Sequence, residues 1–200
     1  MGKPQSLIHT KEGLVLSTIE VINDVGISNL SIRKVATQQG VTEAAIFRHY
    51  KSKNELLLAV LDYFSQYDSD VFATVRLKNL TPTDSIHYCL NTYATYYENY
   101  SAITAITQIY EVFRNESELR EKIDLIIKNR TDFMMGLIND AILKNEIVNV
   151  DSQQLAIMIW GYFREVCMKW RISEYSFSLS EKVQDATDMI FNAFSKKIST

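Results

Sequence analysis

Apolar residues recur every three or four positions along most of the chain, which is the spacing of one face of an α-helix. The pattern predicts long helices over residues 53–78, 82–99, 116–145, 152–172 and 181–198, and shorter ones over 7–25, 32–39, 43–50 and 102–113. Only two prolines and six glycines interrupt the 200 residues, too few turns for a many-stranded β fold. The sequence therefore predicts an all-α protein.

The segment 31–50 has the residue types that two short helices joined by a tight turn require. Ser31 and Thr42 are N-cap residues, and Gly40 can adopt the left-handed backbone that a sharp turn needs. Ala36 is small enough to let the second helix cross close to the first. The alternative is an ordinary helical hairpin inside a bundle, but it does not explain so short a second helix, which is unstable without a partner surface. The segment is typical of a helix-turn-helix, a motif that reads DNA.

Charge is distributed unevenly along the chain, although the net charge is only −3. Residues 1–53 hold seven basic and four acidic residues, a net of +3, and residues 54–200 hold 14 basic and 20 acidic residues, a net of −6. Chance is the alternative for so small a difference. A basic N-terminal part on an acidic body suits a DNA-binding module attached to a domain with another task.

Residues 10–57 resemble the DNA-binding domain of the TetR family of bacterial regulators. The resemblance lies in the runs Leu-Ser-Ile-Arg-Lys-Val-Ala at 30–36, Gly-Val-Thr at 40–42, Ile-Phe-Arg-His-Tyr-Lys-Ser-Lys at 46–53 and Glu-Leu-Leu at 55–57. It implies an N-terminal three-helix helix-turn-helix domain, residues 1–52. A helical-bundle ligand-binding and dimerisation domain, residues 53–200, would follow it.

The resemblance also implies roles for individual residues, chemically consistent with phosphate and base contacts. The residues expected to contact or approach the phosphate backbone are Ser31, Arg33, His49, Tyr50 and Lys53. Those expected on or beside the major groove are Thr42, Glu43, Ala44, Ala45 and Arg48. Phe47 stands where the family often has Tyr, so we expect packing or van der Waals contact there instead of a phosphate hydrogen bond.

The last two predicted helices each carry an apolar stripe, which suits a four-helix interface between two copies and lies where the family usually dimerises. The residues assigned to this homodimer interface are Leu155, Ile159, Gly161, Tyr162, Val166, Ile190 and Phe194. A glycine in mid-helix costs about 1 kcal/mol relative to Ala, which a close helix crossing would explain. The alternative is that both stripes belong to the core of one protomer.

The middle helices are rich in aromatic side chains, which can line a pocket for a partly apolar or aromatic small-molecule effector. The candidate ligand-binding residues are Tyr93, Tyr96, Tyr97, Tyr110, Phe113, Phe133 and Met134. For any one of them, a place in the core is the alternative.

Other classes of site find no support in the sequence. His9, His49 and His87 are isolated from metal ligands and catalytic partners, and no phosphate-binding loop or nucleophile elbow occurs, so we expect no enzyme activity, metal or cofactor. No secretory signal or membrane-length apolar run is present, and Cys89 and Cys167 are expected to be buried reduced thiols, so the expected location is the cytoplasm.

Together these features predict a cytoplasmic homodimer that binds double-stranded operator DNA and is released by an effector, with repression as the expected mode. One rival is a helical enzyme that uses the aromatic pocket, and another is a protein-binding helical scaffold. The enzyme would need a convergent acid–base or metal set, which the sequence lacks, and the scaffold leaves the basic N-terminal part and its tight turn unexplained.

Overall fold

The computed structural model describes residues 11–108 and 110–196. Its elements are all helical, apart from one isolated antiparallel bridge between Ile147 and Ser195 within the described residues. The described residues form two compact units: unit 1 comprises residues 11–66 and 102–123, and unit 2 comprises residues 67–101 and 124–196. The prediction of an all-α fold is confirmed.

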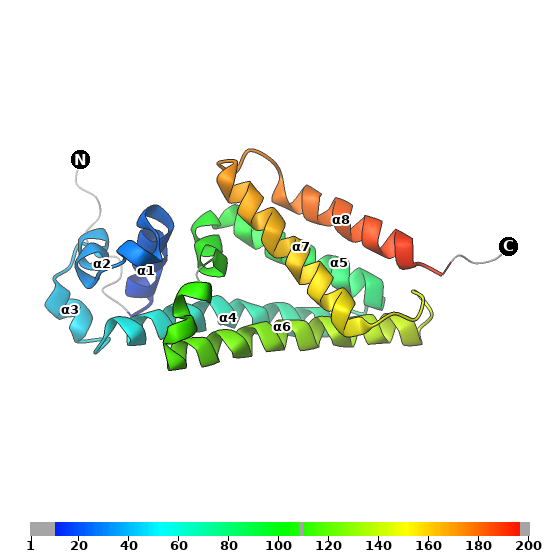
Figure 1. Ribbon diagram of the computed structural model, residues 1–200, viewed down its shortest axis with the longest axis horizontal. Coiled ribbons are helices and arrows are strands. Elements are labelled where there is room, and N and C mark those ends of the chain that lie inside the picture. Colours follow the sequence, from blue (N-terminus) through cyan, green and yellow to red (C-terminus); the bar gives the residue numbers. More distant parts are fainter. Residues whose placement is uncertain (1–10, 109, 197–200) are drawn as a thin grey trace. The chain divides into compact units, whose positions relative to one another are not determined.

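Unit 1 begins with three helices that lie close together (Figure 1). They are α1 (Lys11–Val25), α2 (Ile32–Gln39) and α3 (Glu43–Phe47), with a short 3₁₀ turn, η1 (Ile27–Asn29), between the first two. Ile19, Val35 and Ile46, one from each helix, are fully buried. The apolar residues of α1 thus form a helix and contribute to the core, as their spacing predicted. The part of the first predicted helix before Lys11 lies outside the described residues.

The rest of unit 1 comes from longer elements further along the chain. It takes the first half of α4 (Lys53–Leu77), the 3₁₀ segments η2 (Ser101–Gln108) and η3 (Tyr110–Asn115), and the start of α6 (Ser117–Leu143). We predicted an α-helix over residues 102–113, and the described part of this stretch is 3₁₀ instead. Its apolar residues are nearly contiguous, from Ala102 to Ile106, and all are buried, so the stretch lacks the amphipathic spacing of an α-helix.

Unit 2 consists of the second halves of α4 and α6 with α5 (Pro82–Asn99), α7 (Ser152–Ile172) and α8 (Leu179–Phe194). Helix α8 packs along α5 and also contacts α7 (Figure 1). Two of these helices begin at side-chain caps: Thr81 accepts from the amide of Asp84 with Pro82 in the first turn, and Asp151 accepts from two amides of α7. No described helix has the length and apolarity to cross a membrane.

Two glutamates add caps that sequence periodicity did not reveal, because each reaches a helix far away in the chain. The Glu98 carboxylate on α5 accepts from the backbone amide of Ser180 at 3.1 Å and from its hydroxyl at 2.9 Å, which covers the start of α8. Glu146 does the same for α5, accepting from the amide of Thr83 at 2.9 Å and from its hydroxyl at 2.7 Å. The amides at a helix start have no partner within the helix, so these carboxylates stabilise both α5 and α8.

Candidate nucleic-acid interface

The turn between α2 and α3 depends on one glycine. Gly40 lies at φ 73° and ψ 34°, the left-handed region, and its amide donates to carbonyls in the last turn of α2. Ser31 caps α2 by accepting from the amide of Lys34, and Thr42 caps α3 by accepting from the amide of Ala45. Two short helices meeting at a tight turn are therefore present, as the sequence predicted, and residues 32–50 do not form one straight helix. The second helix is shorter than expected, ending at Phe47.

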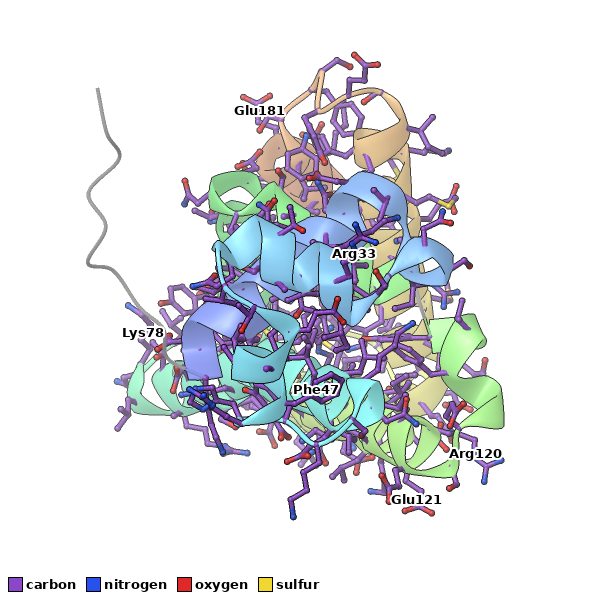
Figure 2. The ribbon with its side chains drawn as sticks, turned by 90° about the vertical axis from the view of Figure 1, so that its left-hand side faces the viewer. Arg33, Phe47, Lys78, Arg120, Glu121 and Glu181 are labelled. Carbon is purple, nitrogen blue, oxygen red and sulfur yellow. The ribbon has the colours of Figure 1, made fainter. Side chains whose placement is uncertain are left out.

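The residues predicted to face DNA divide into an exposed set and a buried one. Those with exposed side chains on α2, α3 and the turns beside them are Arg33, Thr42, Glu43, Ala44, Phe47 and Arg48. Ser31, Ala45, His49 and Lys53 are partly exposed. Figure 2 views unit 1 from the side on which Arg33 and Phe47 lie. The helix-turn-helix therefore presents most of the predicted residues to solvent.

Tyr50 is the exception, because only 5% of its surface is exposed. Its hydroxyl donates to the carbonyl oxygen of Lys11 at 3.1 Å, which ties the end of the helix-turn-helix to the start of α1. Burial, with a smaller contribution from Glu55, raises the pKa of this phenol above its ordinary value. Tyr50 thus packs inside unit 1, and we do not retain it as a phosphate contact.

Two lysine ammonium groups converge on the short segment that leads into α2. The Nζ of Lys53, at the start of α4, donates to the carbonyl oxygen of Leu30 at 2.9 Å, and the Nζ of Lys34 donates to that of Asn29 at 2.9 Å. Each ammonium has three N–H groups, so one carbonyl bond leaves donors for a phosphate oxygen. Lys34 was not among the predicted contacts, although its charge beside Arg33 and the Ser31 cap was a usable signal.

The predicted ligand-binding residues do not form one site within either unit. Tyr93, Tyr96, Tyr97, Phe133 and Met134 belong to unit 2, whereas Tyr110 and Phe113 belong to unit 1. Tyr93, Tyr97 and Met134 are almost completely buried. They belong to the interior of unit 2 in this conformation, as the alternative interpretation held.

A buried ion pair lies within the aromatic interior of unit 2. Arg130 on α6 binds Asp68 on α4, and the hydroxyl of Tyr93 on α5 donates to the same carboxylate at 2.7 Å. The guanidinium lies 5.1 Å from the ring centre of Tyr93 and 5.8 Å from that of Trp160 on α7, so all four helices meet at this charge. Burial, the largest influence, raises the pKa of Tyr93 well above its ordinary value, so the phenol stays protonated and can donate.

The cysteines of unit 2 offer less chemistry than this ion pair. Cys89 and Cys167 are buried free thiols, and burial raises the pKa of each to about 12, so both are inert. In the described part of the chain, no three His, Cys, Asp or Glu side chains gather as metal ligands would. One cavity of about 190 Å³ lies between α5 and α8 beside His87, and one of about 430 Å³ opens between α6 and α7 beside Ile127 and Ile157.

The proposed dimer residues also divide by burial. Leu155, Ile159 and Val166 on α7 are at most 7% exposed within a single protomer, so a second copy cannot cover them further. Our assignment of these three residues to the interface is therefore not retained, because their side of α7 packs into the core of unit 2. Gly161 and Tyr162 are exposed, and Ile190 and Phe194 are partly exposed.

The opposite side of α7 carries apolar residues that the sequence analysis did not select. Ile157 is 49% exposed and Met158 57% exposed, beside Tyr162 at 37%. Met189 on α8 is 72% exposed. The spacing of Met158, Gly161 and Tyr162 by three and four residues is the signal that could have identified this second face.

Two family profiles match the chain one after the other. Residues 11–60 match the family profile described as bacterial regulatory proteins, tetR family, and residues 75–193 match the profile described as the C-terminal region of YsiA-like protein. Over 186 residues, the chain is 20% identical to the fatty acid metabolism regulator protein of Bacillus subtilis, covering 92% of this chain and 95% of that protein.

Solved structures show the same fold. The transcriptional regulator FadR from Bacillus subtilis in complex with stearoyl-CoA matches with a TM-score of 0.81 at 20% identity, covering 92% of this chain and 100% of that one. The fatty acid degradation regulator FadR from Bacillus halodurans matches with a TM-score of 0.79 at 17% identity, covering 94% of this chain and 97% of that one. The matching helix-turn-helix at residues 11–60 and the matching body at residues 75–193 together identify the chain as a member of the TetR family of bacterial transcriptional regulators, which bind DNA and are not enzymes.

Proposed function

We propose that this chain is a homodimeric repressor that binds operator DNA and dissociates from it when a small-molecule effector binds. The DNA-binding domain would be residues 1–52 and the effector and dimerisation domain residues 53–200. The observation that carries the proposal is the exposed surface of α2 and α3, where Arg33, Glu43, Ala44, Phe47 and Arg48 are all open to a ligand. The charges of Arg33 and Arg48 suit phosphates, and the α3 residues suit base edges.

We place the dimer contact on the exposed side of α7 and α8, with Met158, Gly161, Tyr162 and Met189 at its centre. Exposed Met and Tyr side chains are typical of an interface core. A two-fold dimer would hold its two recognition helices about one turn of DNA apart, roughly 34–36 Å, in successive major grooves. Operators with two-fold symmetry follow from this arrangement.

The effector class that we favour is a long-chain acyl-CoA. The support from relatives is the stearoyl-CoA bound by the Bacillus subtilis FadR, whose chain matches this one over its full length. The support from this chain is the apolar and aromatic interior of unit 2. The rings of Tyr93, Tyr97, Phe163 and Trp160 contact one another there. An acyl chain would have to open this packed interior, so binding and a change of conformation are expected to be coupled.

The test begins with operator fragments captured from genomic DNA by the purified protein. Their affinity is then measured by fluorescence anisotropy for the natural chain and for Arg33→Ala. Arg120→Ala is the matched control, because Arg120 is also an exposed arginine of unit 1 and is carried by α6 (Figure 2). We expect Arg33→Ala to lose at least tenfold in affinity with unchanged circular dichroism, and Arg120→Ala to bind normally. Equal affinities for all three proteins would refute the proposed surface.

Effector release is tested on the same captured fragments by adding stearoyl-CoA, with coenzyme A alone as control. A coupling of about 1–3 kcal/mol weakens DNA binding about 5- to 150-fold. Stearoyl-CoA without effect, on a protein that still binds its operator, would reject the acyl-CoA class and leave the DNA-binding proposal intact. Repression itself is read from a reporter gene placed behind a captured operator, whose expression should fall when the protein is present.

A further inference from the structure

The exposed face of α3 is more apolar than a surface meant only for charged contacts. Phe47 is 47% exposed, and Ala44, three residues before it on the same side of the helix, is exposed as well. A phenylalanine ring has no polar atom with which to bind a phosphate or a base edge. A methyl group on Ala44 and a ring on Phe47 can only pack against apolar atoms of a partner.

Some of the polar side chains near Ala44 and Phe47 already make hydrogen bonds within the protein. The Thr42 hydroxyl accepts from the amide of Ala45 at 3.2 Å, and Tyr50 is turned inward. Within the described part of the chain, no hydrogen bond or ion pair engages the side chains of Glu43 and Arg48, which flank the apolar pair. The α3 surface therefore offers an apolar centre between the Glu43 carboxylate and the Arg48 guanidinium, neither of which is engaged by another described residue.

A single exposed apolar residue is common on protein surfaces and by itself indicates nothing. The position of this pair is different, because cationic side chains lie on the helix-turn-helix around it: Arg33, Lys34, Arg48 and Lys51 are all exposed. Positive charge around an apolar centre is complementary to duplex DNA, whose phosphates border grooves that hold both base edges and methyl groups. A hydrophobic protein partner would not require these cations.

We propose that α3 reads thymine through its C5-methyl group, with the Phe47 ring and the Ala44 methyl as the contacting groups. This inference rests on the proposed DNA-binding surface and names the chemistry that the surface recognises. Among the four bases only thymine presents a methyl group in the major groove, so an apolar contact there distinguishes T·A from the other pairs. Glu43 would add a contact to a cytosine amino group, and Arg48 would hold a phosphate or a guanine.

The test removes the methyl group and leaves every hydrogen-bonding group in place. A duplex bound by the protein is selected from a randomised double-stranded library and resynthesised with deoxyuridine replacing thymidine at one position at a time. Removing one buried methyl-sized group should weaken binding about fourfold at the contacted positions. Positions outside the contact should show no change. Binding is measured by anisotropy at one fixed salt concentration.

Two variants locate the effect on α3. In Phe47→Ala, the thymidine and deoxyuridine duplexes should bind equally at the positions that the ring contacts, because the Ala44 methyl alone cannot replace the ring there. Phe47→Tyr retains the ring and should retain the preference. Val25→Ala is the control for loss of exposed apolar surface elsewhere in unit 1, since Val25 is 38% exposed at the end of α1, and it should keep the full thymidine preference.

The possible outcomes distinguish failure of the thymine-methyl contact from failure of the proposed DNA-binding surface. If the protein selects a duplex but deoxyuridine binds as well as thymidine at every position, the methyl reading is wrong and DNA binding stands. If the thymidine preference persists in both Phe47→Ala and Ala44→Gly, the methyl acts through DNA shape and α3 does not read it. If no duplex is selected at all, the proposed DNA-binding surface fails together with the inference.

Discussion

Arg130 on α6 donates two parallel hydrogen bonds to Asp68 on α4, from Nε to Oδ2 at 2.9 Å and from Nη2 to Oδ1 at 2.7 Å. Both side chains are largely buried, Arg130 at 12% and Asp68 at 6% exposure, and both helices contribute to the same unit here. Two parallel charge-assisted bonds fix the orientation as well as the distance of the partners. The pair therefore sets how α4 and α6 align within unit 2.

Removing one member of this pair should destabilise the protein strongly. Asp68→Ala removes the carboxylate that binds the Arg130 guanidinium in this interior, and we expect a loss of about 3–5 kcal/mol in the free energy of unfolding. Urea denaturation followed by circular dichroism measures it. The exposed pair of Lys128 and Asp132 is the control, where Asp132→Ala should cost less than about 1 kcal/mol. A double replacement, Asp68→Leu with Arg130→Met, should recover most of the loss, and its failure to do so would show that the charges themselves are needed.

Glu98 should make stability depend on pH at the acidic end. Burial by itself would raise the pKa of this carboxyl, but hydrogen bonds from Ser180, Ser178 and Leu179 outweigh it and lower the pKa below its ordinary value of 4.5. A carboxyl with a lowered pKa in the folded state stabilises the protein above its unfolded-state pKa, and the gain disappears as the pH falls through the folded-state value. The stabilisation should therefore be constant near neutral pH and decline below about pH 4.5.

The measurement compares the natural chain with Glu98→Gln in urea at a series of pH values. The difference in free energy of unfolding should be largest near neutrality and shrink toward acid. Glu121→Gln, at an exposed position on α6, should give curves parallel to those of the natural chain. A constant difference for Glu98→Gln across the whole range would mean that the Glu98 carboxylate charge is not what holds α8.

Lys53→Ala should reduce the salt dependence of DNA binding. Each lysine that neutralises a phosphate contributes about 0.9 to the slope of log affinity against log salt concentration. Removing the Lys53 ammonium should therefore make that slope shallower by about 0.9, whereas Lys144→Ala, at an exposed lysine after α6, should leave it unchanged. An unaltered slope in Lys53→Ala would show that this ammonium binds the Leu30 carbonyl and no phosphate.

Gly40→Ala should weaken the turn of the helix-turn-helix through backbone strain alone. The φ of 73° is unfavourable for a residue with a Cβ, although an added Cβ would meet nothing within 4 Å. We expect a loss of about 1–2 kcal/mol in stability, measured by thermal unfolding, and weaker DNA binding because α3 is displaced. Gly40→Asn should be milder, since asparagine tolerates this conformation better. Equal stability of Gly40→Ala and the natural chain would show that the turn can adjust to an ordinary φ.

Gly161→Ala tests the dimer face with a closely matched control on α6. Gly161 and Gly136 both lie in mid-helix, both are exposed, and a Cβ at either would meet no atom within 4 Å. Alanine should therefore stabilise either helix by about 1 kcal/mol. Only at Gly161 should it also weaken dimerisation, because a partner helix would approach there. Sedimentation equilibrium measures the association constant, and identical dimerisation of the two variants would remove Gly161 from the interface.

The sequence alone determined the features that depend on local backbone chemistry. The caps at Ser31 and Thr42 and the left-handed turn at Gly40 lie where it predicted them, because each depends on residues only a few positions apart. The same local order of residues made the family recognisable.

Tertiary structure decided which of two sides each helix buries and which distant polar groups meet. Periodicity marked an apolar stripe on α7, but only packing showed that Leu155 and Ile159 face the core while Met158 and Tyr162 face outward. It also brought Arg130 to Asp68 and Glu98 to Ser180, pairs separated by 62 and 82 residues. Such contacts depend on how helices pack around a shared interior, and the spacing of residues along one helix contains no information about its neighbours.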